Sequence, residues 1–115
     1  MIDKYLFGLI VIEGREYNYD VEVRWTGEVL EWRRKKGHIF DVEDVKRAIE
    51  RSPEVIILGT GAYGMASITK ECQEFMQSKK IKIVAKKTSE AIEIFNSIQS
   101  SKEQKRIIGF FHLTC

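Results

Sequence analysis

The pattern of hydrophobic and polar positions in this 115-residue chain is that of strands up to about residue 33. Apolar and polar residues alternate in Val21–Trp25, and the segment Leu6–Ile12 is a short apolar run. Such patterns are typical of strands with one buried face. Turn residues at Glu13–Arg15 and Thr26–Glu28 separate the segments. The pattern therefore predicts an antiparallel meander over residues 6–33.

Three later segments have the 3.6-residue period of amphipathic helices. The first covers residues 41–51, with Asp41 as its N-cap. Thr69 is placed to cap the second helix, and either Thr88 or Ser89 is placed to cap the third. We therefore expect three helices in the second half of the chain.

Apolar segments between these helices predict three further strands, at residues 55–58, 81–85 and 106–113. The first two flank the second helix, so residues 55–85 form a βαβ unit, which is expected to be parallel and right-handed. Together, these elements predict a single α/β domain over residues 1–115. In it, helices cover a mixed sheet, and an antiparallel β portion is added at the N-terminus.

A glycine-rich loop, Gly59–Gly64, follows the strand at residues 55–58 and matches G-x-G-x-x-G. In open α/β sheets, ligands usually bind at the C-terminal ends of the strands. A dinucleotide site requires a helix that begins within the motif, but Met65–Thr69 intervenes here. It also requires an acidic residue after the next strand, where this chain has Lys86 and Lys87.

A P-loop is excluded, because Met65 and Ala66 stand where the phosphate-binding Lys and the Ser or Thr belong. Three interpretations of the glycines remain. They permit sharp turns and close packing, they form a pocket for a small anion or metabolite, or they form a true dinucleotide site. The sequence assigns no catalytic residue.

A pocket at this loop would include residues from neighbouring strand ends. Thr88 follows the adjacent parallel strand, and His38 is the only candidate for a general base at neutral pH. The candidate ligand-binding residues are His38, Gly59, Thr60, Gly61, Tyr63, Gly64 and Thr88.

The charge of the chain gives little support to a nucleic-acid partner. Nineteen Lys and Arg residues oppose 17 Asp and Glu residues, and the net charge is only +2. The segment Arg33–Lys36 beside Trp32 combines basic groups with an aromatic ring, a combination that can contact phosphates and bases. Alternation places Trp32 on the same face as Leu30, which favours packing. Nucleic-acid binding is therefore the second alternative function. The structural explanation of the same residues is a solvated basic loop.

Two cysteines and two histidines form neither a disulfide framework nor a metal-binding pattern. Cys72 lies on the apolar face of the second helix, and the pair His112 and Cys115 lacks a second pair of ligands. We expect no metal and no cofactor. Because there is neither a signal-peptide pattern nor an apolar segment of about 20 residues, we expect a cytoplasmic protein without a membrane partner.

Short segments in a fixed order also identify a resemblance that covers nearly the whole chain. They are Tyr5–Gly8, Tyr17–Val23, Trp32 with Gly37 and His38, Gly59–Gly61 with Gly64, Thr88–Ala91 with Asn96, and His112–Cys115. Together they resemble a family of small domains that includes the mitochondrial complex I assembly factor and the vertebrate adipogenesis-associated protein.

The resemblance implies a three-layer β plus α/β/α domain with a mixed five-stranded central sheet whose last strand runs against the others. It implies no enzymatic activity. The leading hypothesis is thus a non-enzymatic interaction, assembly or regulatory domain with an unidentified protein partner. The alternative is an enzyme or sensor that binds a nucleotide or phosphorylated metabolite at the glycine loop. Self-association through exposed strand edges is a further expectation.

Overall fold

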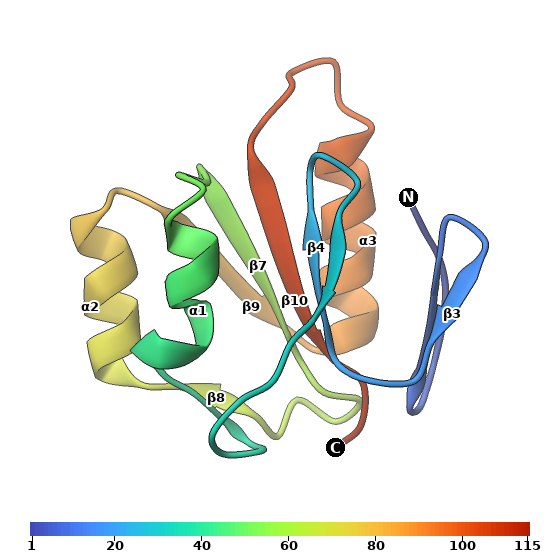
Figure 1. Cartoon of the computed structure of the whole chain (residues 1–115), viewed down its shortest axis with the longest axis horizontal. Coiled ribbons are helices and arrows are strands. Elements are labelled where there is room, and N and C mark those ends of the chain that lie inside the picture. The colour runs from blue at the N-terminus through green and yellow to red at the C-terminus, as the bar shows by residue number, and fades with distance from the viewer.

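A mixed five-stranded sheet lies at the centre of the fold, with helices on both of its faces (Figure 1). The computed structural model describes all 115 residues. The strands are β1 (Ile2–Leu6), β2 (Leu9–Ile12), β3 (Arg15–Tyr17), β4 (Val21–Arg24), β5 (Val29–Glu31), β6 (Ile39–Phe40), β7 (Val55–Thr60), β8 (Ser67–Ile68), β9 (Lys82–Lys86) and β10 (Ile107–His112). The helices are α1 (Val42–Ile49), α2 (Lys70–Ser78) and α3 (Thr88–Gln99).

The central sheet has the strand order β5-β4-β10-β7-β9. Strands β10, β7 and β9 are parallel to one another, whereas β4 pairs antiparallel with both β10 and β5. The expected α/β class with a mixed five-stranded sheet is confirmed. The expectation that the last strand runs against the others is wrong, because β10 is parallel to β7 and it is β4 that runs in the opposite direction.

The N-terminal β portion is divided between two sheets. Strands β1, β2 and β3 form a separate antiparallel sheet, whereas β4 and β5 join the central one. The apolar run Leu6–Ile12 is not one strand, because the chain turns at Phe7 and Gly8, where Gly8 has a φ of +79°. A single meander over residues 6–33 is therefore wrong. The antiparallel N-terminal portion itself is confirmed.

Two hydrophobic cores lie on the two faces of the central sheet. Val55 and Ile57 of β7 face the core formed with α3 and the N-terminal sheet. Ile56 and Leu58 face the second core, under α1 and α2. All four side chains are at most 4% exposed, as expected for a parallel strand covered on both faces. Burial of each such side chain contributes about 1.5–3 kcal/mol.

The ends of the first two helices follow their local sequences. Asp41 caps α1 in a capping box with Asp44, and the Thr69 hydroxyl accepts a hydrogen bond from the Cys72 amide at the start of α2. Cys72 is buried in the core, as predicted, and burial raises the pKa of its thiol to about 12. None of the three helices combines the length and hydropathy needed to cross a membrane.

The start of α3 differs from the prediction. Its N-cap is Lys87, which makes no side-chain capping bond, so neither Thr88 nor Ser89 caps this helix. The Thr88 hydroxyl instead donates to the His112 carbonyl and accepts a hydrogen bond from the Gly61 amide. The Thr88 side chain, which the local pattern assigns to capping, therefore makes tertiary hydrogen bonds instead.

Candidate functional site

The C-terminal ends of the parallel strands bring the glycine loop, Thr88 and His112 together. The Gly61 amide lies 2.9 Å from the Thr88 hydroxyl oxygen, which is 2.6 Å from the His112 carbonyl oxygen. The Thr88 amide in turn donates to the Gly61 carbonyl at 3.1 Å. One buried hydroxyl thus joins the ends of β7 and β10 at the start of α3. The glycine loop and Thr88 are neighbours, as the strand-end rule predicts.

Two glycines of the segment Gly59–Gly64 are required by close packing, and the first of them lies in a strand, because Gly59 and Thr60 are the last two residues of β7. A Cβ atom at Gly59 would lie 2.9 Å from the Thr88 hydroxyl oxygen. Gly61 has a φ of +103°, and a Cβ atom there would lie 2.8 Å from the Thr114 carbonyl oxygen. Both positions exclude any larger residue without local rearrangement.

Most polar groups of the loop are engaged within the protein. The Ala62 amide donates to the Thr114 carbonyl at 2.9 Å, and the Gly64 amide donates to the Gly61 carbonyl at 3.2 Å. The Thr60 hydroxyl donates to the Lys86 carbonyl at 3.0 Å. In this conformation the loop therefore offers few free donors to an anion.

His38 reaches this region through two very short strands. Strands β6 and β8 form a parallel pair, and the Ser67 amide donates to the His38 carbonyl at 2.9 Å. The imidazole rings of His38 and His112 lie edge to face, with their centroids 5.9 Å apart. His38 is exposed, whereas His112 is buried. Each strand has only two residues, which is too short for a hydrophobic pattern to reveal.

A polar cluster of Asp20, Arg34 and His112 lies at the same end of the central sheet. Asp20 Oδ2 is 2.7 Å from His112 Nδ1 and 2.6 Å from Arg34 Nη1, and Asp20 Oδ1 accepts a hydrogen bond from the Leu113 amide at 2.8 Å. The side chains of Arg34 and His112 are each only 6% exposed. Neither Asp20 nor the role of Arg34 is evident from the sequence. The partners Asp20 and His112 are 92 residues apart, so no local pattern connects them.

The cluster keeps Asp20 ionised. Burial tends to raise the pKa of this carboxyl group, but hydrogen bonds from His112, Leu113 and Arg34, with the Arg34 charge, outweigh it and hold the pKa below its usual value. Nδ1 of His112 lies 2.7 Å from Asp20 Oδ2 and 3.0 Å from Arg34 Nη2, and the other ring nitrogen is Nε2. That nitrogen is buried and has no partner in the protein. The pair orients the ring, but it places no side-chain nucleophile beside it.

Two of the four basic side chains before β6 make contacts within the protein. The Arg34 guanidinium stacks on the Trp32 ring at 4.5 Å, and Arg33 pairs with Glu31 at 2.9 Å. Trp32 is only 3% exposed, and its indole nitrogen donates to the Asp44 carbonyl at 2.8 Å. The predicted packing of Trp32 is confirmed. The aromatic ring and one of the four basic groups that suggested nucleic-acid binding therefore face inwards.

Large apolar side chains are exposed above this polar cluster. We call Leu6, Phe7, Tyr63 and Met65 the apolar edge; they are 51%, 58%, 67% and 65% exposed. The β1–β2 turn and the glycine loop meet here, with the rings of Phe7 and Tyr63 6.4 Å apart. The Gly8 amide donates to the Leu113 carbonyl, and the turn, the loop and the C-terminus gather at one end of the molecule (Figure 1).

The histidines and cysteines do not assemble a metal site. No three His, Cys, Asp or Glu side chains lie close enough together to hold a metal ion. Cys115, which the sequence places near His112, is exposed.

Comparison with known proteins gives the family of the chain. The sequence pattern described as "Protein of unknown function (DUF498/DUF598)" matches residues 2–112. The chain belongs to the DUF498/DUF598 family. No curated protein matches it.

Solved structures similar to this DUF498/DUF598 member support the same fold. A conserved hypothetical protein from Pyrococcus horikoshii OT3, PH1505, is 25% identical with a TM-score of 0.90, over 100% of this chain and 99% of that one. The protein MT938 is 29% identical with a TM-score of 0.83, over 100% and 98% of the two chains. A protein from Bordetella parapertussis, at 17% identity and a TM-score of 0.84 over 97% and 93%, shows the fold alone.

Proposed function

We propose that this DUF498/DUF598 member is a non-enzymatic protein-interaction domain that binds its partner through the apolar edge. The observation that carries the proposal is the exposure of four large apolar side chains, each more than half exposed, on two segments that meet. Single exposed apolar residues are common on protein surfaces, whereas grouped ones mark interaction sites. Aromatic residues and Met are also enriched in protein interfaces.

Charge beside the apolar edge indicates the chemistry of the partner. Lys86 and Lys87 are exposed, and the stem of Lys87 lies along the loop, with Cγ 3.3 Å from where a Cβ atom at Gly64 would be. A partner segment with an apolar anchor and neighbouring carboxylates would complement this surface. The proposed role agrees with the resemblance to assembly proteins, and we propose a cytoplasmic setting for it.

The cluster beneath the apolar edge supports binding rather than catalysis. The hydroxyl of Thr88 and the carboxylate of Asp20 fix the strand ends, so little ordering is required when a partner binds. The unpartnered Nε2 of His112 is shielded from solvent, which argues against proton transfer to a substrate at this position.

The proposal is tested by capturing partners from extracts of the native host and then purifying the bound protein for affinity measurements. We expect Phe7→Ser and Tyr63→Ser each to weaken the purified partner's affinity at least about tenfold, as loss of a buried aromatic anchor does. Tyr19→Ser is the matched control, because Tyr19 is also an exposed aromatic residue, at 41%. It packs on Tyr17 and is not part of the apolar edge.

Equal affinities for all three variants would overturn the proposal. Concentration-dependent dimerisation lost in Phe7→Ser would identify a second copy as the partner instead. Binding of a nucleotide or phosphorylated metabolite at the glycine loop, unaffected by Phe7→Ser, would favour the enzyme or sensor alternative. Gly61→Arg is not a clean test of that alternative, because the structure leaves no room for a side chain there.

A further inference from the structure

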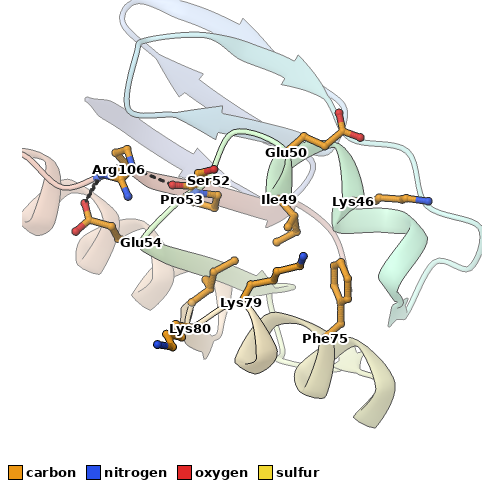
Figure 2. Close-up of a pocket in the computed structure, with 11 residues that line it drawn as sticks. Lys46, Ile49, Glu50, Ser52, Pro53, Glu54, Phe75, Lys79, Lys80 and Arg106 are labelled. Atoms are coloured by element: carbon orange, nitrogen blue, oxygen red, sulfur yellow. Dashed lines mark hydrogen bonds and ion pairs between the residues drawn. The ribbon is translucent and has the colours of Figure 1, made fainter.

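A hollow of about 650 Å³ lies at the opposite end of the central sheet (Figure 2). It is formed by the C-terminal ends of α1 and α2, the connection that precedes β7, and the residue before β10. Its volume is within the range of small-molecule sites, about 300–1,000 Å³. This hollow shares no residue with the apolar edge.

The hollow has an apolar floor between the two helices. Ile49 of α1 and Phe75 of α2 point into the gap, and Lys79 extends between them (Figure 2). Both apolar side chains are only partly buried, whereas Ile81 beneath them is 6% exposed. The floor can therefore bury further apolar surface of a ligand.

The charges around this floor are unequally paired. Arg106 is neutralised, because its guanidinium lies 3.7 Å from Glu54 and donates to the Ser52 carbonyl at 2.8 Å. Three lysines have no carboxylate within 4.0 Å: Lys46, Lys79 and Lys80. Glu50 is the one lining carboxylate without a basic partner. The unpaired charge is therefore predominantly positive.

We propose that this hollow binds a small organic anion with a flat apolar body. The apolar body would lie against Ile49 and Phe75, and its carboxylate, sulfonate or phosphate group would pair with Lys79. The Lys79 ammonium is 5.8 Å from the centroid of the Phe75 ring, so the same ligand can contact both groups. Charge-assisted hydrogen bonds are stronger than neutral ones.

Lysines at the ends of α1 and α2 also complement the negative ends of the helix dipoles. That role accounts for positive charge, but it does not require a hollow of this size or a partly buried aromatic ring inside it. The two explanations differ in what they predict for ligands. Only a preformed binding site for an anion distinguishes an aromatic anion from its uncharged analogue.

The experiment compares two fluorescent probes, 8-anilinonaphthalene-1-sulfonate and the uncharged N-phenyl-1-naphthylamine. We expect the sulfonate to bind, Lys79→Met to weaken its binding about tenfold, and Phe75→Ser to weaken it at least as much. Lys79→Met is expected to leave binding of the uncharged probe within about twofold, because the substitution retains the apolar stem.

Matched controls lie outside both proposed sites. Lys4→Met and Tyr19→Ser are expected to leave sulfonate binding unchanged, because neither residue lines the hollow or belongs to the apolar edge. Equal loss of both probes in Lys79→Met, or loss of sulfonate binding in Phe7→Ser with none in Phe75→Ser, would overturn the proposal. Complete absence of sulfonate binding would overturn it as well. Each of these results leaves the proposed protein interaction at the apolar edge to its own test.

Discussion

Polar groups are arranged in opposite ways at the two ends of the central sheet. At the C-terminal end, Asp20, Arg34 and His112 pair with one another in the interior, and the surface above them is apolar. At the N-terminal end, Lys79 and Lys80 have no ionic partner and border an open hollow. In our two proposals, interior pairing suits the first end to binding a macromolecule, whereas unpaired charge leaves the second end available to a small anion.

The largest expected effect comes from removing the carboxylate of the polar cluster. Asp20→Asn leaves Arg34 buried without its counter-charge, and we expect a loss of about 3 kcal/mol in the free energy of unfolding. Glu54→Gln is the matched change at the other end, where both members of the ion pair are about half exposed, at 52% and 44%. It should cost under about 0.5 kcal/mol. Urea unfolding of both variants measures the difference, and equal losses would remove the contrast between the two ends.

A somewhat smaller loss is expected from Gly61→Ala. The positive φ and the nearby Thr114 carbonyl oxygen both oppose a Cβ atom, so the free energy of unfolding should fall by about 2 kcal/mol. Gly37→Ala is the control, because a Cβ atom there meets nothing within 4 Å. If both variants were as stable as the wild type, the glycine loop would not be fixed by packing, and its glycines would need a functional explanation.

The contribution of Asp20 should also depend on pH. Because its pKa is lowered in the folded protein, its stabilising effect is fully present above the pKa of the unfolded chain, about 4, and is lost as pH falls through the folded value. The stability difference between wild type and Asp20→Asn should thus shrink as pH falls from about 5 to below about 4. Unfolding measured across this range checks the sign, and a gap that grew as pH fell through it would contradict the proposed pairing.

The smallest effect is expected at the hollow. Lys79→Met removes a charge that has no ionic partner, so the free energy of unfolding should change by less than about 0.5 kcal/mol. Thermal unfolding at matched pH is sufficient to measure this. A loss above about 1 kcal/mol would mean that the charge of Lys79 stabilises the helix ends, and that its role is structural and not ligand binding.

Local rules predicted much of this fold from sequence. The caps at Asp41 and Thr69, the buried strand β7 and the core position of Cys72 each depend on near neighbours in the chain. The strand-end rule also placed the glycine loop beside Thr88. These features need only periodicity, capping preferences and the parallel order of neighbouring strands.

The same local rules could not predict polar contacts between residues that are far apart in the sequence. Asp20 contacts His112, which is 92 residues away in sequence. From sequence alone, Arg34 cannot be distinguished from the exposed residues of its basic segment, because its partner Asp20 is distant. Thr88 has a suitable position for a cap, but its hydroxyl is used by two distant backbone groups. The apolar edge was missed for a related reason, since Phe7 and Tyr63 meet only after two sheets have formed.

The most direct test of the contrast between the two ends is one amide-shift experiment by NMR with both ligand classes. We predict that the purified protein partner shifts amides around Phe7 and Tyr63, whereas 8-anilinonaphthalene-1-sulfonate shifts those around Phe75 and Lys79. Separate maps would support a division of function between the two ends of one sheet. Both ligands mapping to the same end would contradict it.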